Sequence, residues 1–194
     1  PHRSDGTYVY PGTCRDLKHP PADRLPAWRV RVPDREMEFT DTVQGVYREN
    51  LLRDCGACVV RRADGVYVYQ LAVTVDDGES GVTEVVRGWD LLSSSPRQMY
   101  LQELFGFPQP RYCHVPLLTA PDGRRLSKRD RDLDMGALRK NSTPEQVLGV
   151  LAQAAGQIDR YAPVSARELA QIFDWSRVKG EEIPVYALER LVNP

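Results

Sequence analysis

A basic loop that follows a tight turn is the stretch whose residue types best suit chemistry. The turn is Pro121-Asp122-Gly123, and four of the seven residues from Arg124 to Asp130 are cationic. Lysine offers a compact positive charge and arginine a forked donor, so such a loop can hold a polyphosphate. A solvated surface turn has the same composition, and the residues alone leave both interpretations open.

Two segments contain side chains that can bind a metal. Tyr10 and Cys14 flank a tight turn, which can bring a phenol and a thiol to one ion, although such residues often serve only in packing. Cys55 and Cys58 have the spacing of a metal or redox pair, but no second such pair follows, and small residues entering a strand are the other interpretation. With four scattered cysteines we expect free thiols.

Polar residues also follow or interrupt the apolar runs of the chain. Asp76 and Asp77 come after a long apolar run, where they form either an ordinary turn or the edge of a site at a strand end. Arg87 follows a short β-branched run. His114 lies in a third such segment, and the residues alone allow a packed histidine or a catalytic one.

The scaffold that positions these residues is predicted to belong to the α/β class. Apolar and β-branched runs predict strands at 28–32, 37–46 (with a polar turn at 38–41), 58–62, 66–75, 82–86 and 112–115. Asp64-Gly65 predicts a hairpin whose second arm, 66–75, is a buried central strand.

Capping boxes predict where the helices begin. One starts at Ser95, and its helix ends at Gly106, so the strands on either side of it form a parallel βαβ unit. Two more, at Thr143 and Ser165, begin the helices of a small C-terminal module.

The composition sets the broad class of protein. The 194 residues are 41% hydrophobic and 27% charged, with a formal net charge of -1, as is typical of a soluble globular protein. No apolar run can span a bilayer and no signal-peptide pattern opens the chain, so we expect a cytoplasmic protein without a membrane partner. Any nucleic acid would be met by local basic patches.

Six stretches of the chain carry a family resemblance. They are Trp28 to Pro33 with Phe39-Thr40-Asp41 and Gln44-Gly45, Val59 to Gly65, Tyr69 to Ala72 with Asp76-Asp77, Gly81 to Gly88, His114 to Leu118, and Arg125 to Arg129. In this order and spacing they resemble the class I glutamyl-tRNA synthetase family. The last resembles the KMSKS-type loop with which that family holds ATP.

The resemblance implies a fold and three regions. Residues 55–120 would be the second half of a class I Rossmann-type nucleotide-binding domain. An inserted acceptor-type, zinc-binding region would occupy 1–54. Residues 121–194 would hold the KMSKS-type loop and a helical module that contacts the tRNA stem.

The chain is similar in particular to a short paralogue of that family, which lacks the large anticodon-binding region. The paralogue is a monomeric ATP-dependent ligase that activates glutamate without needing tRNA and transfers it to the queuosine base in the anticodon of tRNA(Asp). Two alternatives stay open. One is a fragment of a full glutamyl-tRNA synthetase that charges tRNA(Glu), and the other is a non-catalytic tRNA-binding module.

The family's site residues carry over at the matching positions. Tyr69 and Arg87 would hold glutamate, with Arg87 paired to its α-carboxylate. Lys128 would stabilise the negative charge that develops on the phosphates of ATP, which would be bound together with Mg²⁺. The loop residues that hold ATP would be Arg125, Leu126, Ser127, Lys128 and Arg129. Tyr10 and Cys14 would be half of a zinc site, and the backbone at 114–118 would line the adenine pocket, which leaves the His114 side chain structural.

Three family features are not found in this sequence. The HIGH-type motif, an early acidic glutamate contact and a Cys-x-Cys pair that completes the zinc site would all precede Pro1. We therefore expect the chain alone to lack adenylation activity and to ligate zinc incompletely. Arg125 replaces the usual first lysine of the loop, which keeps the charge and changes the geometry.

Overall fold

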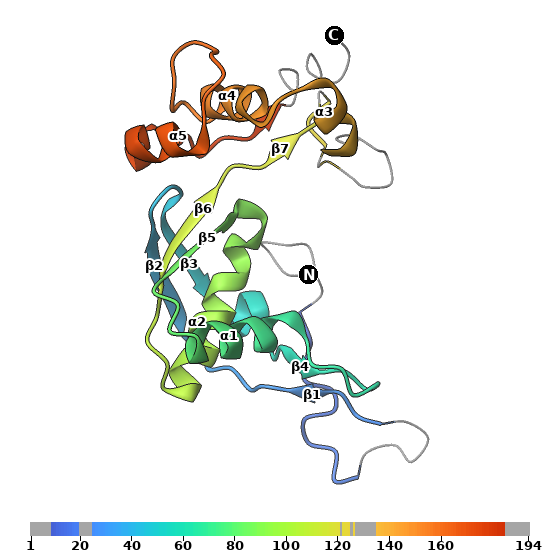
Figure 1. Ribbon diagram of the computed structural model, residues 1–194. Coiled ribbons are helices and arrows are strands. Elements are labelled where there is room, and N and C mark those ends of the chain that lie inside the picture. The colour runs from blue at the N-terminus through green and yellow to red at the C-terminus, as the bar shows by residue number, and fades with distance from the viewer. Residues whose placement is uncertain (1–8, 20–24, 121, 125, 127–134, 185–194) are drawn as a thin grey trace. The chain divides into compact units, whose positions relative to one another are not determined.

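The computed structural model describes residues 9–19, 25–120, 122–124, 126 and 135–184 (Figure 1). The chain divides into two compact units. The first comprises Pro1–Val86 and Asp90–Cys113, and the second comprises Arg87–Trp89 and His114–Pro194.

The first unit contains an antiparallel hairpin of β2 (Glu36–Asp41) and β3 (Gly45–Asn50), in continuous register. The buried Asp41 carboxylate accepts hydrogen bonds from the backbone N–H groups of Val43 and Gln44 at 3.0 and 2.9 Å, which forms the turn. The turn predicted four residues earlier was wrong, because those residues pair with β3 throughout their length.

A second antiparallel pair joins β1 (Trp28–Arg29) to β4 (Val59–Arg61). The predicted hairpin after β4 is confirmed near its turn. Arg61 bridges to Tyr67, and the Asp64 carboxylate accepts a bond from the backbone of the residue that follows Gly65.

The second arm of that hairpin was wrongly predicted as a long buried strand. From Tyr69 the chain forms helix α1 (Tyr69–Glu79), which packs beside helix α2 (Ser95–Phe105) (Figure 1). Gln70 and Thr74 are one helical turn apart and share the face turned to α2, and Thr74 is 1% exposed. This buried polar face outweighs the β-branched composition. Asp76-Asp77-Gly78 consequently lie inside α1 and do not end a strand.

A chain of hydrogen bonds joins these two helices. Gln98 Nε2 donates to Gln70 Oε1 at 2.7 Å, and Gln70 Nε2 donates to Ser94 Oγ at 2.9 Å. Gln98 and Ser94 are both buried. Because a buried amide is costly when unpaired, the chain of bonds specifies how α1 and α2 face each other.

Helix α2 connects two neighbouring strands, β5 (Glu84–Gly88) and β6 (Arg111–Val115). At the start of the pair the Arg111 N–H donates to the Thr83 carbonyl at 2.9 Å. Near the end of both strands, Arg87 of β5 donates a hydrogen bond to His114 of β6. The two strands therefore run in the same direction, and the predicted βαβ unit is confirmed.

The two ends of α2 differ in how well the sequence predicted them. Gly106 ends the helix in the left-handed conformation with φ 72°, as predicted. The capping box at Ser95 was wrong, because a 3₁₀ turn (Trp89–Ser94) leads directly into the helix and Ser94 takes the N-cap position without a side-chain cap bond.

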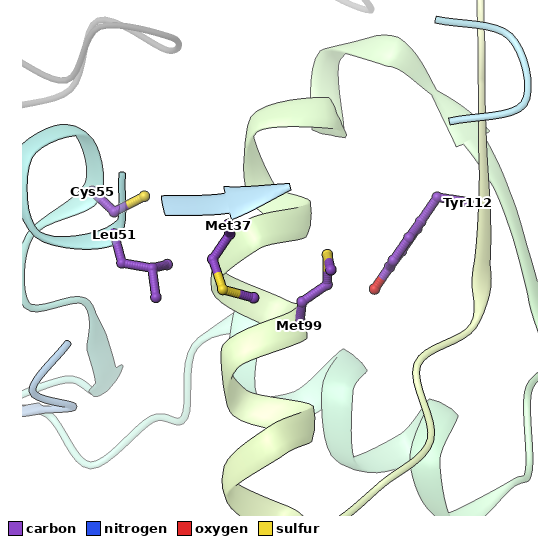
Figure 2. Close-up of a cluster of buried hydrophobic side chains, with 5 residues drawn as sticks. All are labelled: Met37, Leu51, Cys55, Met99 and Tyr112. Atoms are coloured by element: carbon purple, nitrogen blue, oxygen red, sulfur yellow. The ribbon is translucent and has the colours of Figure 1, made fainter. Parts of the chain in front are cut away.

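A cluster of side chains beside α2 forms the core of the first unit (Figure 2). It joins the hairpin β2/β3, the one-turn π-helix Leu51–Cys55, α2 and β6. The buried members are Met37, Leu51, Cys55, Met99 and Tyr112. Each fully buried side chain of this size contributes roughly 1.5–3 kcal/mol, so the cluster fixes the βαβ unit against the hairpin.

Short helices are the main regular elements in the described part of the second unit. They are α3 (Met135–Asn141), α4 (Pro144–Ala154) and α5 (Ala166–Ile172), accompanied by the 3₁₀ turn Trp175–Arg177 and the parallel pair β7 (Leu118–Thr119) and β8 (Ile183–Pro184). The predicted capping boxes at Thr143 and Ser165 are confirmed in both directions. No helix among the described residues is both long and apolar enough to span a membrane.

Candidate active site

Arg87 stands one residue before the end of β5 and is half-buried. Its Nε–H donates to Nε2 of His114 at 2.9 Å. His114 lies on the neighbouring strand β6 and is fully buried. Strand pairing thus brings the predicted glutamate-binding arginine onto an imidazole that is 27 residues away in the sequence.

This contact determines which nitrogen of His114 carries the proton and which N–H group of Arg87 is used. An imidazole that accepts a bond at Nε2 is neutral and carries its proton on Nδ1. The bond uses one of the five N–H donors of the guanidinium, and its two Nη groups are the donors that fork a carboxylate end-on. The resemblance assigned His114 only a structural side chain. The sequence predicts two adjacent parallel strands here, but the register that brings His114 to Arg87 is visible only in the structure.

Tyr69 is the first residue of α1, and 52% of its surface is exposed. The side chain is therefore accessible to a ligand. Tyr69 belongs to the first compact unit and Arg87 to the second. That the two hold one glutamate together stays a prediction.

The turn before the basic loop forms as predicted. The Gly123 N–H donates to the Ala120 carbonyl and the Ala120 N–H donates to the Arg124 carbonyl, both at 2.8 Å. Arg124 also pairs with the Asp122 carboxylate at 3.3 Å. Leu126 packs against the buried Val150 of α4. The other predicted ATP-binding residues, Arg125, Ser127, Lys128 and Arg129, lie outside the described residues.

The turn that carries Tyr10 and Cys14 is compact. The Cys14 backbone N–H donates to the Tyr10 phenol oxygen at 2.7 Å, and the Arg29 guanidinium lies over the Tyr10 ring, 4.0 Å from its centre. The two predicted metal ligands therefore share one turn. Within the described part of the chain, no three His, Cys, Asp or Glu side chains are grouped as a metal site.

Burial makes the remaining thiols poor ligands and nucleophiles. Loss of water around Cys55, together with the nearby Glu49 carboxylate, raises the pKa of its thiol to about 12. Burial also raises the pKa of Cys58 above its ordinary value. The Cys55 thiol donates to Glu49 Oε1 at 3.4 Å, which keeps its proton in place. The protonated state favours the packing interpretation of this cysteine pair.

These differences predict selective thiol modification. In the presence of a chelator at pH 7.5, we expect a maleimide to label the exposed Cys14 at least about tenfold faster than Cys55 or Cys58, because only the thiolate reacts and burial suppresses it. Mass spectrometry of peptides after timed quenching measures each rate. Cys14→Ser should remove the fast phase, and rapid labelling of Cys55 in the folded protein would contradict the assignment.

An apolar groove of about 560 Å³ lies in the first unit beside the start of α1. Its walls include Trp28, Tyr67, Leu101 and Phe105. The Arg61 guanidinium stands over the rings of Trp28 and Tyr67, 5.1 and 5.6 Å from their centres. None of the predicted site residues lines this groove, so it is separate from the predicted substrate contacts.

Several curated proteins with similar sequences carry the same name. The chain is 49% identical over 167 residues, 86% of its length, to the Glutamyl-Q tRNA(Asp) synthetase of Pseudomonas fluorescens, and covers 54% of that protein. It is 53% identical over 139 residues, 72% of its length, to the protein of the same name from Geobacter sulfurreducens, and covers 44% of it. The chain spans about half the length of the curated relatives it matches.

Solved structures show the same architecture. A glutamate tRNA ligase from Elizabethkingia meningosepticum, crystallised in complex with its amino acid, superposes with a TM-score of 0.68 at 27% identity. The match covers 83% of this chain and 36% of that one. The chain therefore shares its α/β architecture with a glutamate tRNA ligase. The family model for the catalytic domain of class I tRNA synthetases (E and Q) matches residues 18–188, and the chain belongs to that family.

Proposed function

We propose that this protein is an ATP-dependent ligase that activates glutamate without tRNA and transfers it to the queuosine base in the anticodon of tRNA(Asp). The observation that carries the proposal is an identity of 43–58% to relatives named Glutamyl-Q tRNA(Asp) synthetase. Identity to two glutamate tRNA ligases of known structure is 26–27%.

Glutamate would be held by Arg87 and Tyr69. A guanidinium pairs with a carboxylate through two parallel charge-assisted bonds, which fix orientation as well as distance. In the activation step one oxygen of the bound carboxylate forms a bond to the α-phosphorus of ATP. The bond from that phosphorus to the bridging oxygen breaks, and pyrophosphate leaves with its electron pair. Arg87 would serve this step by positioning the nucleophile.

ATP, with Mg²⁺, would be held by the basic loop. Lys128 would stabilise the charge that develops on the leaving phosphates, with Arg125 and Arg129 beside it. The packing of Leu126 on α4 supports this role, because it anchors the chain two residues before Lys128. An anchored loop loses less conformational freedom when its cations close on the phosphates.

Zinc would be bound by the turn of Tyr10 and Cys14. The two side chains fit half of such a site, because a thiolate is a preferred zinc ligand and the phenol supplies an oxygen donor on the same turn. Two further ligands would come from outside the described residues. Zinc bound there would cross-link this turn to a second segment, which is a structural contribution.

The first experiment is glutamate-dependent exchange between ATP and labelled pyrophosphate, on the full-length protein with no tRNA added. Exchange is expected, because the proposed enzyme activates glutamate without tRNA. Exchange that appears only with tRNA(Glu) would identify a glutamyl-tRNA synthetase. A complete lack of exchange under both conditions would favour a non-catalytic tRNA-binding module.

The second experiment separates the acceptors. Labelled glutamate should be transferred to tRNA(Asp) that contains queuosine and not to the same tRNA with guanine in its place. Transfer to the terminal adenosine of tRNA(Glu) would contradict the proposal. The matched pair of tRNA(Asp) samples differs only in the modified base, so the difference reports that base alone.

A further inference from the structure

We infer that His114 is a positioning residue that orients Arg87 for the glutamate carboxylate. The inference rests on the proposed function, in which Arg87 binds glutamate. It adds a role for a side chain that the family resemblance left structural.

The geometry places the two residues in a fixed relation. Both lie near the ends of adjacent parallel strands, and the distance from Arg87 Nε to His114 Nε2 is 2.9 Å. His114 has no exposed surface, so the imidazole cannot turn into solvent. Arg87 is only half-buried, which leaves part of it within reach of a ligand. A buried acceptor thus holds the Nε of a side chain that is itself only half-buried.

The point of attachment on the guanidinium determines what this bond can do. The Nε–H lies in the plane of the group, so a bond there restrains the plane and the direction in which the two Nη groups point. A carboxylate bound end-on needs both Nη groups in one orientation. By holding Nε, His114 removes much of the rotational freedom that Arg87 would otherwise lose when glutamate binds.

Substitutions of His114 separate this role from packing. Glutamine can place Oε1 where Nε2 lies and so provide an acceptor, whereas leucine fills similar space without one. We expect His114→Leu to raise the KM for glutamate about tenfold or more in pyrophosphate exchange, with the KM for ATP changed less than about twofold. His114→Gln should return the KM for glutamate to within about threefold of the wild type. Equal glutamate KM values for the leucine variant and the wild type would overturn the inference.

A double-mutant cycle with Arg87→Lys gives a second test. Lysine keeps the charge but has no Nε–H to donate, so His114→Leu should add little to the glutamate KM in that background. Effects that simply add would indicate a packing role and overturn the inference.

If the leucine variant does not fold, as judged by thermal unfolding, His114→Asn replaces it. The shorter asparagine cannot bring an acceptor to the Nε2 position, and a glutamate KM equal to that of His114→Gln would then decide against positioning.

Failure of the inference is distinct from failure of the proposed function. If the wild-type protein shows no glutamate-dependent exchange, the proposed function is wrong and the inference falls with it. If the wild type exchanges and the His114 variants leave its glutamate KM unchanged, only the inference is overturned.

Discussion

Arg87→Ala is expected to abolish glutamate-dependent pyrophosphate exchange at ordinary glutamate concentrations. Loss of a charge-assisted, bidentate contact should lower kcat/KM for glutamate by roughly 100-fold or more, because the substrate carboxylate is left without its guanidinium partner. The measurement is exchange as a function of glutamate concentration at saturating ATP. Near-normal exchange would remove Arg87 from the site.

Two further variants show whether the Arg87→Ala effect is specific. Arg87→Lys keeps the charge and loses the fork, so its kcat/KM should fall between those of the wild type and the alanine variant. Arg111→Ala removes an arginine from the neighbouring strand, where it pairs with Glu84 at 2.7 Å and is 60% exposed. An exposed pair of this kind contributes at most about 1 kcal/mol, so glutamate KM should not change.

Gly149→Ala is expected to destabilise the second unit. Gly149 is buried inside α4, and a Cβ there would lie 2.1 Å from the backbone carbonyl oxygen of Ala162. Alanine improves helix propensity by about 1 kcal/mol. The clash is with backbone, which must shift by about 1 Å, and overpacking of this severity costs roughly 3 kcal/mol or more. The clash outweighs the propensity gain, and we expect a net loss of about 2 kcal/mol.

Urea unfolding monitored by circular dichroism measures this loss as a lower midpoint. Gln153→Ala is the matched control, because Gln153 is an exposed position in the same helix. Its urea midpoint should change little, because its free energy of unfolding should stay within about 0.5 kcal/mol of the wild-type value. A stabilised Gly149→Ala variant would show that α4 and the segment at Ala162 can separate without cost.

Capping residues and glycines correctly predicted where several helices begin or end, because these boundaries depend on residues that are neighbours in the sequence. The helices after Thr143 and Ser165 form where reciprocal caps satisfy their first N–H groups, and α2 ends where Gly106 provides a left-handed residue. The chain at 66–75 was misread, because its valines favour a strand by composition. The decisive residues were Gln70, which is bonded to Gln98 of α2, and Thr74, which lies buried one helical turn further along α1.

The candidate site was predictable to a similar extent. The turns of Tyr10 and Cys14, and of Asp122 and Gly123, follow from short-range spacing and form as expected. The partner of Arg87 did not follow from the sequence, because it depends on the register of two strands joined by a helix. A one-residue slip would place His114 on the other face of its strand.

The bonds between α1 and α2 also constrain how this sequence can diverge. The donors and acceptors run in one direction, from Gln98 through Gln70 to the Ser94 hydroxyl. A change at one position removes at least one of these hydrogen bonds, so single substitutions cost stability even when the new residue has the right size. Among descendants of this protein the three positions should therefore change together or remain as they are.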